Sequence, residues 1–131
     1  MVKDHIPKYI WCFWDSKDLP DTVRVSLDTW RHFNPDYKIT VINKRNIKKL
    51  IPSINFNKIK IAKDSIQKFS DFIRINVLQK YGGIWIDGSS FCTCPFDDWF
   101  KKIGMTNKTD FIGYFNPQFS KKKVGKEISH D

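Results

Sequence analysis

The chain has 131 residues, of which 40% are hydrophobic and 15% aromatic, and its formal net charge at pH 7 is +9. This length predicts one domain with a core of its own, and the apolar content argues against a disordered chain. The positive charge favours an anionic partner, such as a nucleotide, a nucleic acid or an acidic membrane surface.

The first half of the chain predicts alternating strands and helices. Residues 6–14 are rich in aromatic and β-favouring side chains and predict the first strand, on which we place Trp11 and Trp14 on the same face. After a polar connector, apolar residues at helical spacing predict an amphipathic helix that ends near Phe33, before Asn34-Pro35. A second strand over 37–42 and a short basic helix over 43–50 follow.

The second half is predicted around one central helix. Its apolar stripe is Ile66, Phe69, Ile73 and Val77, and Asp64 or Ser65 can cap its first turn. The remaining predicted features are a loop over 55–63, a glycine stop at 82–83, a buried strand over 84–86, a short helical segment over 96–103, a strand over 110–115 and a polar tail. This alternation predicts an α/β fold with a mainly parallel sheet flanked by helices, in a domain over 1–115 with a flexible tail over 116–131.

The cysteines and the hydropathy pattern predict a soluble, cytoplasmic protein. Three cysteines, an odd number, favour a reducing compartment over a disulfide framework. Cys92-Thr93-Cys94 lacks the spacing of a zinc site, so we interpret it as structural. No apolar run approaches the roughly 20 residues of a membrane span, and the polar stretch from Met1 to Lys8 has no signal-peptide core.

The candidate chemistry lies between Phe69 and Ser90. Asp71 and Arg74 are three residues apart on the central helix and share a face, and Asp87 follows the buried strand at the edge where ligands of α/β sheets bind. This arrangement is a plausible holder for a metal and a diphosphate. Each residue also has a simpler interpretation: the helix pair can be a surface ion pair contributing about 0.2–0.5 kcal/mol, and Asp87 can be a turn residue with Gly88.

Trp11 likewise has two interpretations. A tryptophan on a strand usually packs in a core. At the end of the first strand it can instead stack on a nucleobase, which contributes about 1–3 kcal/mol per base.

Four blocks of the sequence together resemble one group of glycosyltransferases. The group has a sugar-binding region with a DXD motif, and it includes the family 32 enzymes and the bacterial capsular polysaccharide synthesis proteins. More distantly, the chain is similar to the glucosylating domain of large clostridial toxins. The blocks occur in the family's order over about residues 5–97 and read Ile6-Pro7-Lys8-x-Ile10-Trp11, Asn34-Pro35-Asp36-Tyr37, Ser70-Asp71-x-x-Arg74 and Tyr81-Gly82-Gly83-Ile84-Trp85-Ile86-Asp87.

The resemblance implies a GT-A-like fold, a nucleotide-sugar donor with a UDP-sugar as the first expectation, a glycan or polysaccharide acceptor, and Mn²⁺ or Mg²⁺. It implies that Trp11 stacks on the donor base, that Asp71 binds donor hydroxyls and that Arg74 binds the sugar–phosphate region. Asp87 would be the first acid of the DXD motif, so Asp87 and Arg74 are the catalytic candidates. Family 32 enzymes retain anomeric configuration, which implies a front-face displacement.

Two departures from the family pattern leave alternatives open. The motif reads Asp87-Gly88-Ser89, so a hydroxyl stands where the second metal-binding carboxylate is usual, and the metal candidates are Asp87 and Ser89. The chain also ends earlier after Asp87 than family members do, which predicts truncation at the carboxyl-terminal side and a partner subunit that supplies the acceptor half. The alternatives are therefore a non-catalytic module that binds a nucleotide sugar or a partner, and a basic nucleic-acid binder that lacks a recognition motif. Peripheral association with a membrane is a further expectation.

Overall fold

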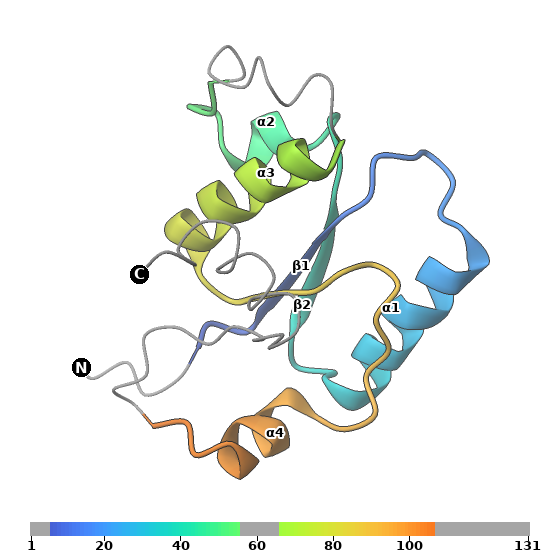
Figure 1. Cartoon of the computed structure of the whole chain (residues 1–131), viewed down its shortest axis with the longest axis vertical. Coiled ribbons are helices and arrows are strands. Elements are labelled where there is room, and N and C mark those ends of the chain that lie inside the picture. The colour runs from blue at the N-terminus through green and yellow to red at the C-terminus, as the bar shows by residue number, and fades with distance from the viewer. Residues whose placement is uncertain (1–5, 56–65, 107–131) are drawn as a thin grey trace, which may run out of the picture.

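The computed structural model describes residues 6–55 and 66–106 (Figure 1). Strands and helices alternate along the chain, as the sequence predicts. The elements are β1 (Tyr9–Phe13), α1 (Asp21–Phe33), β2 (Lys38–Ile42), α2 (Ile47–Leu50), α3 (Ile66–Tyr81), β3 (Ile84–Trp85) and α4 (Phe96–Lys102).

The strands form a parallel sheet with the order β2-β1-β3, which confirms the predicted α/β class. β1 is the central strand: Tyr9 pairs with Lys38, and Trp11 pairs with Trp85. Two backbone bonds extend these ladders by one residue each. The N–H of Trp14 donates to the carbonyl of Ile42, and the N–H of Ile86 donates to the carbonyl of Trp11, both at 2.9 Å.

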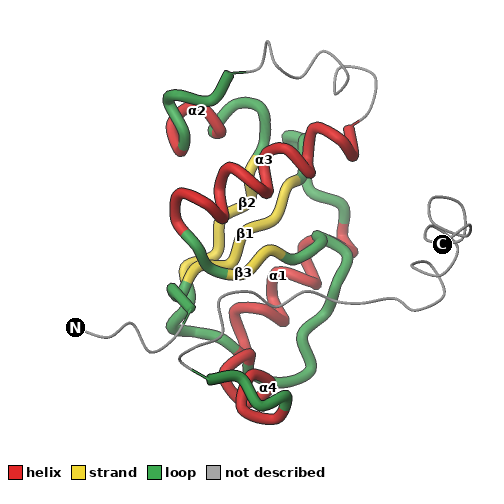
Figure 2. Tube along the Cα trace, turned by 60° about the vertical axis from the view of Figure 1, so that its left-hand side comes forward, coloured by secondary structure: helices red, strands yellow, loops and turns green. Residues whose placement is uncertain are grey.

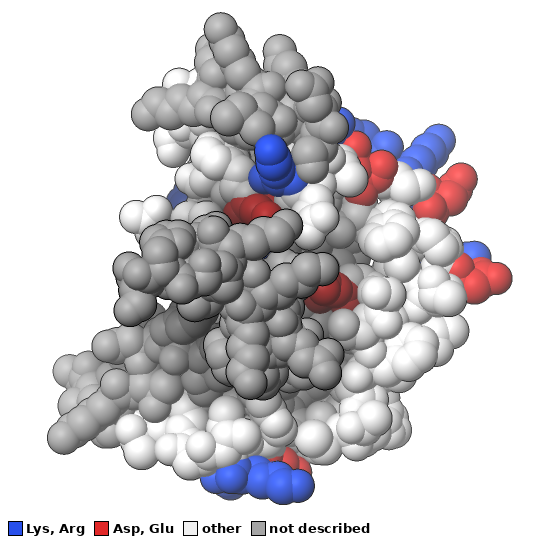
Figure 3. All heavy atoms as spheres, viewed as in Figure 1, with Lys and Arg blue, Asp and Glu red and all other residues white. Residues whose placement is uncertain are grey.

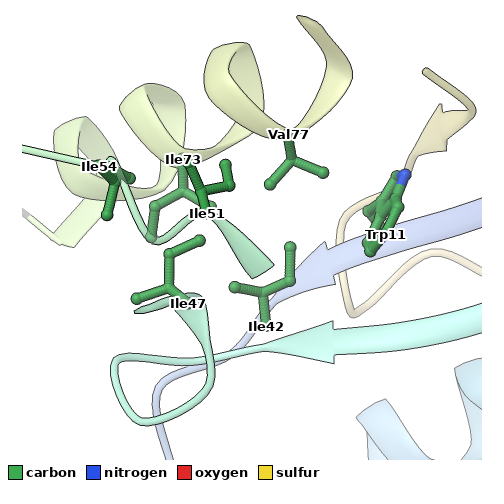
Figure 4. Packing of buried hydrophobic residues seen from close by; sticks show 7 residues of the cluster. All are labelled: Trp11, Ile42, Ile47, Ile51, Ile54, Ile73 and Val77. Atoms are coloured by element: carbon green, nitrogen blue, oxygen red, sulfur yellow. The ribbon is translucent and has the colours of Figure 1, made fainter. Parts of the chain in front are cut away.

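Helices cover both faces of the sheet (Figures 1 and 2). On one face, α2 and α3 enclose a cluster of buried residues shown in Figure 4, namely Trp11, Ile42, Ile47, Ile51, Ile54, Ile73 and Val77. On the other face, α1 closes a second cluster of Ile10, Cys12, Val23, Leu27, Trp30 and Tyr37. The alternation of side chains along β1 therefore divides its residues between two cores.

The prediction that Trp11 and Trp14 share a face is wrong. Trp11 belongs to the cluster under α3, whereas Trp14 packs against the cluster under α1. The two residues are three positions apart, and side chains three apart on an extended chain point in opposite directions. The prediction that Ile66 belongs to the apolar stripe of α3 is also wrong, because Ile66 lies at the start of the helix and is 56% exposed. Phe69, Ile73 and Val77 do face the core.

The glycine turn between α3 and β3 is confirmed. Gly82 and Gly83 have φ angles of +69° and +100°, a region in which L side chains are strained. A Cβ on Gly83 would lie 2.7 Å from the carbonyl oxygen of Tyr9, so the turn also needs a residue without a side chain in order to pass β1. This close approach allows β3 to pair with β1 immediately after α3 ends.

The remaining boundaries differ from the predictions by a few residues. β1 is shorter than 6–14, α2 covers only the second half of 43–50, and β3 ends one residue before 86, although its pairing continues through the Ile86 N–H. The predicted strand over 110–115, the tail over 116–131, most of the loop over 55–63 and the caps at 64–65 lie outside the described residues. Within the described residues, no helix is both long and apolar enough to cross a membrane.

Candidate functional site

The carboxyl ends of the three parallel strands meet at one edge of the sheet. β1 continues into Trp14 and Asp15, β2 into Asn43 and Lys44, and β3 into the turn that begins with Asp87. Loops at this edge of a parallel sheet commonly carry ligand-binding groups. The predicted Asp87 thus lies at the same edge as the segments that follow β1 and β2.

The turn after β3 is anchored so that its acidic side chain faces solvent. Asp87 and Ser89 are exposed, while Gly88 between them is buried. The N–H of Ser90 closes the turn on the carbonyl of Asp87 at 3.0 Å. Helix α1 holds the next residues, because the indole N–H of Trp30 donates to the carbonyl of Ser90 at 2.7 Å. The Asp87 carboxylate and the Ser89 hydroxyl are therefore presented on a fixed backbone.

Gly88 is buried because it packs under Trp14. A Cβ on Gly88 would lie 3.2 Å from Cε3 of Trp14 and 3.5 Å from Cγ1 of Val23. The residue between Asp87 and Ser89 thus connects the end of β3 to the residue that directly follows β1. A side chain at position 88 would displace the Trp14 ring.

Asp71 and Arg74 form an ion pair on α3, with 3.2 Å between Oδ1 of Asp71 and a guanidinium nitrogen of Arg74. Their side chains are 47% and 43% exposed, so both remain accessible to a ligand. The N-terminal half of α3 lies near the carboxyl edge, because Phe69 packs on Phe13 with ring centroids 5.6 Å apart. In the described ranges, no hydrogen bond or ion pair joins Asp87 to this pair.

Figure 3 shows acidic side chains at two places on one face of the molecule. One lies over α3, with a basic side chain beside it, and another lies over the segment that follows β3.

Trp11 lies inside the core. It is 3% exposed, and its ring lies between those of Tyr9 and Tyr81, with centroid distances of 5.5 and 5.4 Å. Its indole N–H donates to the carbonyl of Gly82 at 2.8 Å. This packing corresponds to the core interpretation that the sequence left open, and base stacking by Trp11 stays a prediction.

Trp14 is the aromatic side chain that the sequence interpretation overlooked at this edge. It is half-buried, directly follows β1 and touches Gly88 of the Asp87 turn. The sequence does contain a signal for it, because a residue that follows the strand is nearer to the carboxyl edge than Trp11, which lies at the strand's centre.

Asp15 and Lys44 were also overlooked. The N–H of Lys44 donates to Oδ1 of Asp15 at 3.0 Å, and the Lys44 amine lies 3.5 Å from Oδ2 of the same carboxylate. The amine also lies 5.4 Å from the centre of the Phe69 ring on α3. The two residues connect the loops after β1 and β2 to each other and to α3. Only tertiary structure brings them together, so the sequence carries no signal for them.

Cys12 lies behind the edge on β1. Burial raises the pKa of its thiol from 9.0 to about 12, and the negative charge of Asp87 adds a smaller increase in the same direction. A thiol with this pKa is protonated at neutral pH and is a poor nucleophile. Cys12 therefore serves as a core residue.

The residues that could hold a divalent cation are Asp87 and Ser89. The described residues contain no cluster of three or more His, Cys, Asp or Glu side chains that could enclose a metal ion. Mg²⁺-type sites commonly combine one or two carboxylates with water and substrate phosphates. One exposed carboxylate and a neighbouring hydroxyl fit that open type of site, and do not fit a closed protein cage.

A pocket of about 360 Å³ lies away from this edge, near the start of β2, and is lined by Arg31, Asn34, Pro35, Tyr37 and Ile39. The block Asn34-Pro35-Asp36-Tyr37 has a structural task there. The amide of Asn34 donates to the carbonyl of Trp30 and accepts the N–H of Phe96, while the Tyr37 hydroxyl donates to Asp97 at 2.7 Å. These contacts attach α4 to α1 and β2, so the pocket is not the candidate site.

The chain is similar to two fungal mannosyltransferases. It is 31% identical over 109 residues to an initiation-specific alpha-1,6-mannosyltransferase of Candida albicans, a match that covers 76% of this chain and 28% of the relative. It is 29% identical over 105 residues to the protein of the same name in Saccharomyces cerevisiae, covering 72% of this chain and 22% of that relative. The chain thus spans about a quarter of the length of these relatives. No solved structure matches it significantly.

The family model extends over almost the whole chain. Residues 2–128 match the capsular polysaccharide synthesis proteins. This match includes every residue of the carboxyl edge, and it agrees with the resemblance carried by the four sequence blocks. The chain belongs to the capsular polysaccharide synthesis protein family.

Proposed function

We propose that this chain is the donor-binding part of a glycosyltransferase that transfers a sugar from a nucleotide-sugar donor to a glycan or polysaccharide acceptor. The observation that carries the proposal is the exposed Asp87 carboxylate, held on an anchored turn at the carboxyl edge of a parallel sheet. The mannosyltransferase names of the two relatives make a mannosyl donor a natural one to test beside a UDP-sugar.

Each polar residue of the edge has a distinct task in this proposal. Asp87 and Ser89 would hold a divalent cation, Mn²⁺ or Mg²⁺, at this edge. Such a cation would supply positive charge to neutralise the leaving diphosphate. Arg74 binds a phosphate through its planar fork of donors, and Asp71 accepts hydrogen bonds from donor hydroxyls. The half-exposed state of both helix residues supports these tasks, since neither must leave a core to reach a ligand.

The proposed reaction retains anomeric configuration. The bond from the anomeric carbon to the diphosphate oxygen breaks, and the acceptor oxygen bonds to that carbon on the same face. The proton of the acceptor hydroxyl passes to the departing diphosphate. Arg74 stabilises the negative charge that develops on the leaving diphosphate, which is where preorganised electrostatics contribute most to such a step. Asp87 would contribute only through the cation that it holds.

We assign base stacking to Trp14 in preference to Trp11. Trp14 is half-buried beside the Asp87 turn, whereas Trp11 is enclosed by two tyrosine rings. A GT-A-type arrangement of the sheet is part of the same proposal, supported by the parallel order β2-β1-β3 with the carboxylate directly after β3.

The test is sugar transfer or donor hydrolysis in the presence of Mn²⁺. Asp87→Ala is expected to abolish turnover, whereas Asp98→Ala, which removes an exposed carboxylate from the distant helix α4, should leave it unchanged. Equal turnover by the wild type and Asp87→Ala would contradict a catalytic role for this edge.

Ser89 favours a second candidate, a module that binds a nucleotide sugar without catalysis. A neutral hydroxyl in place of a carboxylate weakens the attraction for a cation. This candidate predicts donor binding with little dependence on Mn²⁺ and no turnover. Ser89→Asp separates the two candidates, because it should increase the affinity for Mn²⁺ only if position 89 contacts the ion.

The proposal also places the protein in the cytoplasm, in peripheral contact with the inner face of a membrane. The supporting observation is the net charge of +9, which favours binding to anionic lipid. Co-sedimentation with anionic vesicles but not with neutral ones is the expected result.

A further inference from the structure

We propose that Asp15 is a positioning residue of the donor-binding edge, which holds Lys44 where it can bind the diphosphate of the donor. The inference rests on the proposed function, because it assumes that a nucleotide sugar binds at this edge. It concerns the side where β1 and β2 end, opposite the side formed by the Asp87 turn.

The first observation is that Asp15 continues the pairing of β1 and β2 after the backbone ladder stops. The last backbone bond between these two segments in the described chain runs from Trp14 to Ile42. One residue later, the Asp15 carboxylate accepts the backbone N–H of Lys44 at 3.0 Å. A side chain thus replaces a strand carbonyl, and it fixes the two loops to each other where regular pairing no longer can.

The second observation is the low exposure of this side chain compared with the other paired carboxylates, although Asp15 as a whole residue is exposed. The Asp15 side chain is 27% exposed, less than any other carboxylate that forms an ion pair in the described part of the chain. Partial removal from water strengthens its attraction for Lys44 compared with a surface pair.

The third observation is the position of the Lys44 amine. It lies 3.5 Å from Oδ2 of Asp15 and 5.4 Å from the centre of the Phe69 ring, and its side chain remains 57% exposed. Phe69 in turn packs on Phe13 of β1. The amine thus lies between two loops and α3, and part of its surface faces solvent. This exposed part leaves the cation accessible to an anionic ligand.

The position of the pair explains why it matters for binding. Asp15 directly follows Trp14, whose ring lies on Gly88 of the Asp87 turn. A shift of the loop after β1 would move the proposed base-stacking ring and the Lys44 cation together. Because Asp15 has a hydrogen bond to the backbone of Lys44, it can limit this shift without touching the ligand.

The experiment measures donor affinity by calorimetry, with the nucleotide sugar that stabilises the wild type best among UDP-, GDP- and CMP-sugars. Asp15→Ala should weaken binding roughly tenfold, the equivalent of losing one hydrogen bond to a charged group. Asp15→Asn should stay within about threefold of the wild type, because the amide oxygen still accepts the Lys44 N–H. Lys44→Met, which keeps the backbone bond and loses the cation, should weaken binding about as much as Asp15→Ala.

The matched control is Asp28→Ala, which breaks the surface pair of Asp28 with Arg31 on α1 and should leave the affinity unchanged. If Asp15→Ala fails to fold, Asp15→Asn and Lys44→Met carry the test.

Wild-type affinity in Asp15→Ala or in Lys44→Met would overturn the inference and leave the proposed function intact. An Asp15→Asn variant as weak as Asp15→Ala would overturn positioning through the backbone bond. A wild-type chain that binds no nucleotide sugar would refute the proposed function and this inference together.

Discussion

The indole N–H of Trp11 donates a 2.8 Å hydrogen bond to the carbonyl of Gly82, which connects the central strand to the turn between α3 and β3. Asp71 and Arg74 precede this turn on α3, and Asp87 follows it after β3. The turn between the helix pair and the strand-end carboxylate is thus bonded to a buried tryptophan of the central strand, in addition to the pairing of β3 with β1.

Trp11 and Trp14 are expected to respond differently to substitution. Trp11→Phe keeps an apolar ring but loses the bond to Gly82, so the free energy of unfolding should fall by about 1 kcal/mol or more with little effect on donor affinity. Trp14→Ala should weaken donor binding by about 1–3 kcal/mol, the contribution of one stacked base. Chemical denaturation and calorimetry measure the two quantities. A loss of affinity confined to Trp11→Phe would instead assign stacking to Trp11.

The glycine turn gives a second prediction, with a control inside the chain. Gly83→Ala should reduce the free energy of unfolding by more than about 2 kcal/mol, because its Cβ would overlap the Tyr9 carbonyl and its φ angle is positive. Gly104 also has a positive φ, but nothing lies within 4 Å of a Cβ at this position. Gly104→Ala should therefore reduce the free energy of unfolding by only about 1 kcal/mol. Equal losses in urea denaturation would show that the contact with Tyr9 is unimportant.

Much of this fold could be predicted from the sequence, because its signals are local. The glycine pair, the apolar spacing of α3 and the short strand before Asp87 each follow from backbone or packing rules that act over a few residues. The face of Trp14 was mispredicted through its spacing from Trp11. The Asp15–Lys44 pair could not have been predicted, because it depends on how two loops distant in sequence meet at the sheet edge. The placement of Asp71 and Arg74 on one face of α3 was predictable, while their tasks stay predictions.

Arg74 should matter for binding and not for stability. Its ion pair with Asp71 has the same i, i+3 spacing and 3.2 Å distance as the pair of Arg31 with Asp28 on α1. Arg74→Ala and Arg31→Ala should therefore each change the free energy of unfolding by no more than about 0.5 kcal/mol. Of these two variants, only Arg74→Ala should weaken donor binding. Arg74→Lys should weaken it less than Arg74→Ala, because lysine keeps the positive charge but lacks the planar fork. Equal donor affinities of the two alanine variants would contradict the role of Arg74.

The Cys12 thiol predicts how stability depends on alkaline pH. Its pKa is raised to about 12 in the folded protein, by burial first and by Asp87 second. In the unfolded chain a thiol loses its proton near its ordinary pKa of 9.0, so above this pH the folded state binds more protons than the unfolded state. The contribution of Cys12 to stability is therefore fully present below about pH 9 and declines as the pH rises toward 12.

Cys12→Ala should lessen this decline, which is measured as the slope of the unfolding free energy against pH. The slope, and not the absolute stability, is the quantity to compare, because the substitution also removes buried atoms. Identical slopes in the wild type and Cys12→Ala would contradict the raised pKa.

The most direct test of the central claim, that the carboxyl edge binds a nucleotide sugar through Asp87, is a thermal-shift panel of UDP-, GDP- and CMP-sugars with and without Mn²⁺. A ligand that binds only the folded state raises the unfolding temperature, and at a given concentration a tighter ligand raises it more. Sugars of one base are expected to stabilise the wild type, Mn²⁺ should enlarge the shift, and Asp87→Ala should remove the enlargement. No shift with any nucleotide sugar, in the presence or absence of Mn²⁺, would contradict the central claim.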